Sequence, residues 1–357
     1  MTDSAARPPV PSARSTRHVG AFIVCTIAAA LFGASSPASK ALLGSMSPLT
    51  LAGLLYLGAA LGVLPFAFRS GPRSQRRSGK NLLRLGGVVL FGGVLGPALL
   101  LVGLARAPAA SVSLWLMLET PATALLGWAF FKEHLDRRTV AAVVLVTAAS
   151  ALLAGAPGTA LIPSTLLVAG ACACWGLDNN LSAVIDGFTP AQATLAKGVV
   201  AGTVNLVLGL IIETPTFSAA NLGAALLLGA LAYGASIVLY VRGAQQLGAV
   251  RSQLLFSSAP FFGVVLAWVA LREPVLTSQL VASMLMVAAI VLLHRDRHAH
   301  AHAHEPMTHT HWHRHDDDHH DHDHVTAVRG GHVHEHEHQR TSHSHPHPPD
   351  LHHRHRH

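Results

Sequence analysis

The chain has 357 residues, of which 50% are hydrophobic and only 12% are charged. A soluble domain carries about 25% charged residues, so the composition excludes an ordinary soluble protein and indicates an integral membrane protein. The net charge of +7 does not indicate nucleic-acid binding, because the basic residues cluster between apolar stretches. The three cysteines all lie in apolar stretches, where a buried thiol behaves as a small hydrophobic group, so no disulfide framework is predicted.

Residues 1–18 are rich in Pro, Ser, Ala and Arg and are predicted to form a disordered basic N-terminus. The apolar run that follows, with small residues after it, is also compatible with a signal peptide. A repeat argues against that alternative, because Phe32-Gly33 is echoed by Trp175-Gly176. A removed leader would have no counterpart in the middle of the chain.

Ten apolar segments follow one another, separated by turn residues such as Gly, Pro and Ser. About 20 apolar residues cross the hydrocarbon core as a helix, and open sheet edges cannot face lipid. The sequence therefore predicts an all-α integral membrane protein with ten transmembrane helices, at residues 19–40, 48–68, 82–104, 109–131, 138–155, 163–183, 191–212, 221–241, 248–270 and 275–294.

The stretch Ala109–Glu133 has a second copy at Ala249–Glu273. Both copies carry a proline near the middle and end in a basic residue followed by Glu. We therefore predict two five-helix repeats, at residues 19–155 and 156–294. Because five is an odd number, the second repeat enters the membrane from the opposite side, as in secondary transporters whose substrate site lies near the midplane.

Lys and Arg concentrate in the connections after even-numbered helices, above all between Arg69 and Arg84. Basic loops remain in the cytoplasm. The prediction is a multi-pass protein of the cytoplasmic membrane with both termini on the cytoplasmic side.

The repeated residues also resemble a known family. The stretch from Phe32-Gly33 to Lys40, the Phe-Phe-Lys-Glu and Leu-Arg-Glu endings of the two copies, and Trp175-Gly176 are similar to the drug/metabolite transporter superfamily, in its EamA-like ten-helix branch. The resemblance covers residues 19–294. It implies two inverted five-helix halves around a central cavity, and export or exchange of small metabolites without ATP hydrolysis.

One position departs from that family. Its first helix often carries Asn about four residues before the Lys, where this chain has Ser36. No phosphate-binding loop and no nucleophile–base pair are visible, so an enzyme is not expected.

Glu119 is the leading candidate for a functional residue, because an ionisable side chain at mid-membrane costs about 2.5–3.5 kcal/mol and is a functional hypothesis by default. The second copy has Ser258-Ala259 there, so the repeated framework does not require an acid. Pro121 nearby is expected to loosen the helical hydrogen bonding. Glu119 is either a proton carrier or cation-facing group, or a buried acid paired with Lys or with a neighbouring helix.

Other polar residues in the helices are further candidates for contacts with substrate or coupling ion. Asp178, Asn179 and Asn180 alternatively lie near a helix end that faces water. Lys40 can instead extend to the interface, Lys40 and Lys197 can each neutralise an acid, and Asn205 can bond between helices. This set is Asp178, Asn179, Asn180, Lys40, Lys197 and Asn205.

Residues 295–357 form a tail that holds 23 of the 26 histidines. Alternating His with interspersed Asp and Glu is a disordered, metal-chelating composition, and neutral imidazole suits Ni, Zn, Co and Cu. Adventitious binding and pH sensing are alternatives. The predicted metal ligands are His298, His300, His302, His304, His309, His311, His313, His315, His319, His320, His322, His324, His332, His334, His336 and His338.

Three functions remain in view. The first is a proton- or gradient-coupled exporter of a small metabolite, working by alternating access around Glu119. The second is an exporter of a transition metal or metal chelate that uses the tail for capture or sensing. The third is a membrane-anchored metal buffer or sensor that transports nothing. The expected partners are the lipid bilayer, a small-molecule substrate and divalent metal ions. No cofactor is required, no nucleic acid is expected, and a homodimer is compatible with the sequence.

Overall fold

The computed structural model describes residues 13–69, 79–131, 137–155, 162–185, 188–213, 217–247, 252, 255–294, 298–304, 307–313, 332–338 and 341–347. The chain divides into a helical unit, which holds the described residues up to His294, and a second unit at Asp296–Pro349 within the tail. The two units are described separately.

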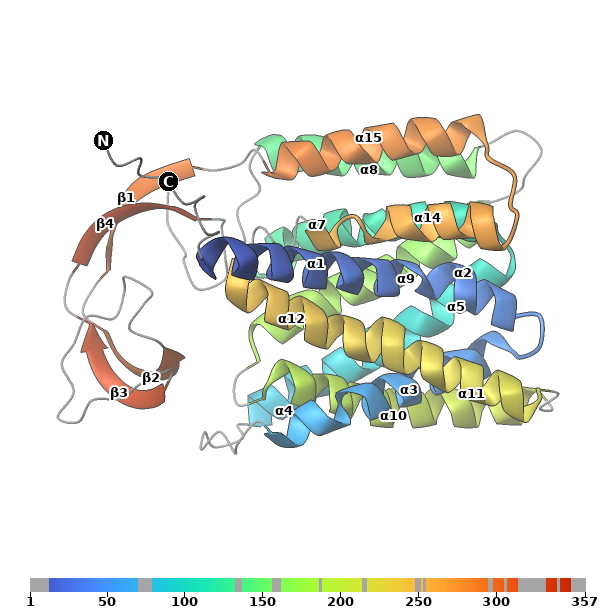
Figure 1. Cartoon of the computed structure of the whole chain (residues 1–357), viewed down its shortest axis with the longest axis horizontal. Coiled ribbons are helices and arrows are strands. Elements are labelled where there is room, and N and C mark those ends of the chain that lie inside the picture. The colour runs from blue at the N-terminus through green and yellow to red at the C-terminus, as the bar shows by residue number, and fades with distance from the viewer. Residues whose placement is uncertain are drawn as a thin grey trace, which may run out of the picture. The chain divides into compact units, whose positions relative to one another are not determined.

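The described helices of the first unit fall into ten segments, which confirms the predicted number (Figure 1). The five of the first repeat are α1–α2 (Ala13–Gly33, Ser35–Leu42), α3 (Pro48–Arg69), α4–η1–α5 (Gly79–Gly87, Val88–Leu95, Gly96–Ala105), α6–η2–α7 (Ala109–Trp115, Leu116–Leu118, Glu119–Phe131) and α8 (Arg137–Ala154). The five of the second repeat are α9 (Ile162–Ala183), α10 (Pro190–Ile212), α11–η3–α12 (Ala219–Leu228, Gly229–Ala235, Ser236–Leu247), α14 (Ala259–Ala270) and α15 (Thr277–His294).

The largest differences from the predicted boundaries lie at α14 and α1. Helix α14 begins at Ala259, after a turn at residues 257–258, whereas the prediction placed that segment at residues 248–270. Helix α1 begins at Ala13 instead of residue 19, so the end of the predicted disordered N-terminus is helical. The last proline before it is Pro11, and the Ala and Arg residues that follow are good helix formers.

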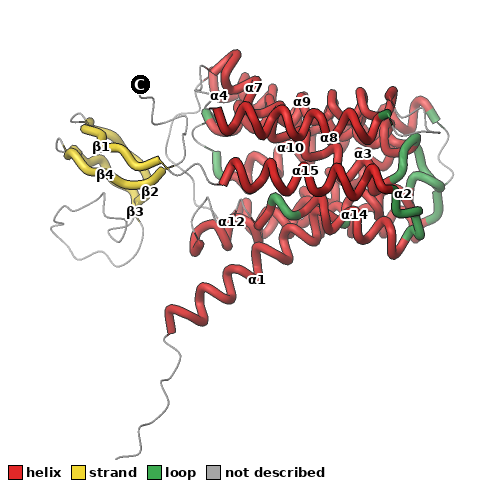
Figure 2. Tube along the Cα trace, turned by 90° about the horizontal axis from the view of Figure 1, so that it is seen from above, coloured by secondary structure: helices red, strands yellow, loops and turns green. Residues whose placement is uncertain are grey.

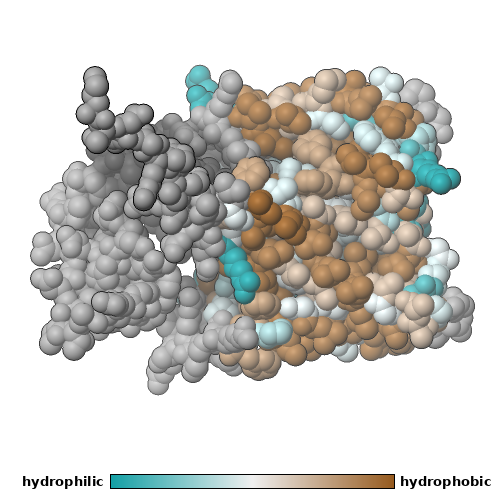
Figure 3. All heavy atoms as spheres, viewed as in Figure 1, coloured by the Kyte–Doolittle hydropathy of each residue, from teal (hydrophilic) through white to brown (hydrophobic). Residues whose placement is uncertain are grey.

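The surface of the helical unit is that of a membrane protein. In the described residues, seven helices are long and apolar enough to cross a bilayer, and two shorter apolar helices lie at Ala259–Ala270 and Thr277–Leu292. Large apolar side chains such as Leu83 and Ile211 are exposed on the outside, and apolar residues dominate the visible face of the bundle (Figure 3). The protein is therefore a multi-pass membrane protein.

The helix packing has the symmetry of an inverted repeat. Figures 1 and 2 show one counterpart pair, α8 and α15, side by side. Helix α1 packs on α12, and its repeat counterpart α9 packs on α5, the counterpart of α12. Likewise α1 packs on α14 while α9 packs on α7, and α3 packs on η3 while α10 packs on η1. The first three contacts thus come in matching pairs, as a two-fold relation between the repeats requires. Three pairs of counterpart segments pack on each other: α3 on α10, the segment α6–η2–α7 on α14 through α6, and α8 on α15.

Glycines on α3 allow this close packing. A Cβ at Gly58 would lie 2.2 Å from the carbonyl oxygen of Leu226, and one at Gly62 would lie 2.7 Å from that of Ala230. Small residues four apart are the pattern that brings helix backbones together in membranes.

The tail contains four short strands that the sequence analysis did not predict: β1 (His298–His304), β2 (Met307–His313), β3 (His332–His338) and β4 (Thr341–His347). β1 pairs antiparallel with β4, and β2 pairs antiparallel with β3. The alternation of His with a second residue has a period of two, which is the strand period. The prediction of a disordered tail rested on composition alone, so it did not take this two-residue period into account.

Candidate functional site

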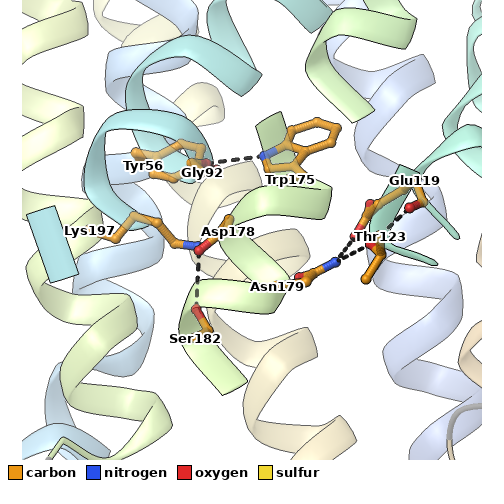
Figure 4. A network of polar contacts seen from close by, with 9 residues as sticks. All are labelled: Tyr56, Gly92, Glu119, Thr123, Trp175, Asp178, Asn179, Ser182 and Lys197. Atoms are coloured by element: carbon orange, nitrogen blue, oxygen red, sulfur yellow. Dashed lines mark hydrogen bonds and ion pairs between the residues drawn. The ribbon is translucent and has the colours of Figure 1, made fainter. Parts of the chain in front are cut away.

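Four of the predicted residues come together on three helices (Figure 4). Helix α9 contributes Asp178 and Asn179, which are neighbours in sequence. Asp178 contacts Lys197 on α10, and Asn179 contacts Glu119 at the start of α7. The second repeat supplies both members of the first pair, whereas the second pair joins the two repeats.

Asp178 and Lys197 form an ion pair inside the bundle. Lys197 Nζ lies 2.6 Å from Asp178 Oδ2, and the side chains are 18% and 7% exposed, respectively. Ser182 Oγ donates a further hydrogen bond to Asp178 Oδ1 at 3.2 Å. Removing two charges from water is costly, and the mutual attraction offsets that cost only when both partners are present. The space for the carboxylate comes from Gly92, where a Cβ would lie 2.1 Å from Asp178 Oδ2.

Glu119 is held by a neutral amide. Asn179 Nδ2 donates to Glu119 Oε1 at 2.8 Å and to Thr123 Oγ1 at 3.2 Å. Thr123 Oγ1 in turn donates to the backbone oxygen of Glu119 at 2.9 Å. The predicted loosening near Pro121 is present, since a 3₁₀ turn at Leu116–Leu118 immediately precedes Glu119. The acid therefore lies where α6 gives way to α7.

Asn179 is exposed although it lies on the interior face of α9. Val168, Cys172, Trp175 and Asn179 are spaced by four, three and four residues, so they form one stripe along the helix. Val168 and Cys172 are 0% exposed, whereas Asn179 is exposed and Glu119 is intermediate. The exposed residues Leu166 and Ala173 lie on a different face. The accessible surface of Asn179 therefore lies on the side of α9 that faces the other helices.

A π-helical turn completes the surroundings of the ion pair. The Gly96 N–H bonds to Phe91 O, five residues back, and Pro97 has no N–H to give. The carbonyl of Gly92 instead receives Tyr56 Oη at 2.6 Å and Trp175 Nε1 at 3.1 Å. Side chains from two other helices thus satisfy a backbone group that this turn leaves without a helical donor.

The π-helical turn also provides the hydrogen-bond acceptors of Asn205. Its Nδ2 donates to the carbonyls of Gly93 at 3.1 Å and Val94 at 3.4 Å, which is the interhelical bonding given above as its alternative role. Asn180 likewise bonds backbone, donating to Gly176 O at 2.8 Å and Thr123 O at 3.0 Å. Both side chains position the segments that carry the site.

Lys40 lies apart from these residues. Its Nζ donates to the carbonyls of Leu104 at 2.7 Å and Ala105 at 3.1 Å, the last residues of α5. A Lys at this place satisfies carbonyls that have no helical partner and complements the helix dipole. The Lys40 contact therefore stabilises the C-terminal end of α5.

Three members of the site were not predicted from the sequence: Tyr56, Thr123 and Ser182. Each is a polar side chain in a largely apolar segment, and such residues are common in packed helices. The available signal for Tyr56 was the pair Gly96-Pro97 inside an apolar segment, because proline removes a helical donor.

The comparison with known proteins follows the repeat boundaries. Residues 19–155 and, separately, 162–295 match the EamA-like transporter family. The chain belongs to the EamA-like transporter family.

Other proteins are similar to this EamA-like transporter. An uncharacterized transporter of Methanothermobacter thermautotrophicus is 27% identical over an alignment 303 residues long, which covers 78% of this chain and 87% of that protein. A protein of known crystal structure aligns with 77% of this chain and 96% of its own, with a TM-score of 0.55 and 17% identity. The second likeness concerns the fold alone.

A contact between the repeats lies at the start of α6 in this EamA-like transporter. Glu273, from the second repeat, accepts the N–H of Ala109 at Oε1 (2.7 Å) and of Ala110 at Oε2 (2.9 Å). The first N–H groups of a helix have no helical acceptor, and its positive dipole end favours a carboxylate. Arg272, just before, has φ of 54°, a conformation that is costly for a residue other than glycine. We call this contact the Glu273 cap.

The predicted metal ligands divide between described and undescribed parts of the tail. His298, His300, His302 and His304 lie in β1, and the ligands at 309–313 and 332–338 lie in β2 and β3. Five lie outside the described residues: His315, His319, His320, His322 and His324. Among residues whose side chains the structure describes, no three His, Cys, Asp or Glu are grouped to hold a metal.

Proposed function

We propose that this protein is a secondary transporter that exports or exchanges a small metabolite across the cytoplasmic membrane by proton-coupled alternating access. The observation that carries the proposal is the exposed Asn179 on the interior stripe of α9, in contact with Glu119. An amide and a carboxyl group that face lipid would be costly, whereas polar groups that line an aqueous cavity are tolerated. These two side chains are the groups that a substrate or proton would meet.

Glu119 suits proton transfer better than Asp178 does. Asp178 is bound to Lys197, so its protonation would leave a buried ammonium without a partner. Asn179 donates to Glu119 without carrying charge, and such a contact tolerates either protonation state of the carboxyl group. A proton can therefore enter or leave at Glu119 without the loss of an ion pair.

The Asp178–Lys197 pair is the second element of the proposed site. Asn179 follows Asp178 directly, so a substrate bound at Asn179 lies next to both charges. A charged substrate group can compete for one partner of the pair. Such competition links substrate binding to the contact between α9 and α10.

The helix ends support a direction for the proposed opening. Asn179 and Ser182 are exposed near the C-terminal end of α9. That end leads into an even-numbered connection, which the Lys and Arg distribution assigns to the cytoplasm. The Glu273 cap lies in odd-numbered connections, on the opposite side. We infer a state that is open to the cytoplasm and closed on the outside.

The inverted repeat then suggests how the other state closes. Glu133 corresponds to Glu273, and Ala249 and Val250 correspond to the capped residues Ala109 and Ala110. These counterparts lie outside the described residues. In the outward-open state, we expect Glu133 to cap Ala249 and Val250 on the cytoplasmic side while the Glu273 cap is released. Rocking of two such halves around a midplane site is how inverted-repeat transporters alternate.

The proposal is tested with the full chain in proteoliposomes that enclose a pH-sensitive dye. A panel of small metabolites is added, one at a time, under an imposed proton gradient. For at least one metabolite, we expect the wild type to move protons and Glu119→Gln to lose at least about tenfold in rate. Glu213→Gln, a carboxyl-to-amide change at the exposed end of α10, is the matched control and should behave as wild type. Equal proton movement in Glu119→Gln and the wild type would overturn the role of Glu119.

A further inference from the structure

The strands of the tail place its histidines in register with one another. In the first ribbon, His298, His300 and His302 of β1 lie directly opposite His347, His345 and His343 of β4. In the second ribbon, His309, His311 and His313 of β2 lie directly opposite His336, His334 and His332 of β3. Six His–His pairs therefore lie at directly opposite register positions, three in each ribbon.

The register also assigns all of these positions to one face of each ribbon. Alternate residues of a strand share a face, and directly opposite residues of paired strands share it too. The positions between them hold Ala299, Ala301 and Ala303 opposite Pro346, Ser344 and Ser342 in the first ribbon. In the second ribbon they hold Thr308, Thr310 and Trp312 opposite Glu337, Glu335 and Val333. One face carries the histidines and the other carries none of those of the four strands.

This spacing suits a metal bound by imidazoles from both strands. Directly opposite Cβ atoms are about 4.5–5.5 Å apart. Two imidazole nitrogens on one ion are at most about 4 Å apart, since each lies about 2.0–2.1 Å from the metal. The next pair along the ribbon is about 6.6 Å away, twice the rise per residue. Two adjacent pairs therefore place four histidine positions around one ion.

We propose that each ribbon is a divalent transition-metal site built from adjacent cross-strand histidine pairs, with His300–His345 and His302–His343 as the central set in the first ribbon. The ligand class is an ion that prefers neutral imidazole, such as Zn²⁺, Ni²⁺, Co²⁺ or Cu²⁺. The site depends on strand register and not on histidine content alone. It does not rest on the proposed transport function.

Two variants of the full chain separate register from composition. In both, every histidine from His298 onward is replaced by Gln except four. The paired variant keeps His300, His302, His343 and His345. The unpaired variant keeps His300, His302, His334 and His336, which lie in different ribbons. Each has four imidazoles in two His-x-His motifs, and the loop lengths between the motifs are similar, so loop-closure entropy differs little.

The measurement is Zn²⁺ affinity and stoichiometry by competition with a chromogenic chelator, on the detergent-purified protein at neutral pH. The expected result is one Zn²⁺ per chain in the paired variant, bound at least about tenfold more tightly than in the unpaired variant. Equal affinities, or tighter binding by the unpaired variant, would show a chelator that depends on composition alone and would overturn the proposal. A wild-type chain that binds fewer than two Zn²⁺ would also overturn it.

Discussion

The two repeats share a framework but not their polar residues. Aligned on Phe32-Gly33 and Trp175-Gly176, Ser36 corresponds to Asn179. Ser36 is buried, and its hydroxyl has no hydrogen-bond partner within the part of the chain that the structure describes. Asn179 is exposed and bonds to Glu119.

The same contrast holds for the neighbouring positions. On this alignment Ser35 corresponds to Asp178, so a neutral hydroxyl lies where the second repeat has one half of an ion pair. Both repeats have a π-helical turn at corresponding places, η1 and η3. The repeat therefore determines the packing, and departures from it determine where charge and hydrogen-bonding groups are concentrated. Glu119, Asp178 and Asn179 of the proposed substrate site accordingly have no charged or amide counterparts at the corresponding positions of the other repeat.

The largest effect is expected when the ion pair is broken on one side only. Lys197→Leu leaves the Asp178 carboxylate buried without its partner, which costs about 3–5 kcal/mol of unfolding free energy. The double variant Asp178→Ser with Lys197→Leu removes both charges of the pair and should recover most of that loss. Thermal unfolding in detergent provides the measurement. A single variant as stable as the wild type would mean that the pair is not buried as described.

A smaller effect is expected at Gly92, whose missing side chain makes room for the Asp178 carboxylate. Gly92→Ala forces the carboxylate or the π-helical turn to move, which costs about 1–3 kcal/mol and should also reduce transport. Gly86→Ala on α4 is the control, because nothing lies within 4 Å of a Cβ there. If the two variants unfold alike, the close contact at Gly92 does not constrain the site.

The smallest effect is expected at the Glu273 cap. Glu273→Gln removes the charge but keeps an acceptor, so it should cost about 1 kcal/mol of unfolding free energy, as for other helix caps. It should also shift the conformational equilibrium away from the outward-closed state. Glu213→Gln again serves as the control. An unchanged unfolding midpoint together with unchanged transport would show that the Glu273 cap stabilises neither the fold nor the outward-closed state.

The ten segments were predictable because an apolar segment long enough to cross a bilayer can do so only as a helix or as part of a closed barrel. The repeat was predictable as well, since Ala109–Glu133 and Ala249–Glu273 share a proline near the middle and a basic residue followed by Glu at the end. Four site residues were predicted because charged and amide side chains are rare in such helices.

What the sequence analysis missed depends on contacts between distant segments. The role of Tyr56 arises only because the turn before Pro97 leaves the carbonyl of Gly92 available. The Glu273 cap requires the ends of α14 and the start of α6 to meet, which the repeat implies only once its packing is known. The strands of the tail follow from a two-residue period that composition conceals.

The central claim is that Asn179 faces an aqueous interior that opens to the cytoplasm. Cysteine accessibility tests it most directly, on a background in which Cys25, Cys172 and Cys174 are replaced by Ala. The reagent is a membrane-impermeant maleimide, which reacts with a hydrated thiolate. It is added to inside-out vesicles, and labelling is read by mass shift.

Three positions on α9 are compared: Asn179→Cys, Val168→Cys on the same stripe but buried, and Ala173→Cys on the exposed face away from that stripe. The account predicts labelling of Asn179→Cys, and at least about tenfold slower labelling of the other two. Absence of labelling at Asn179→Cys, or equal labelling at all three positions, would contradict it.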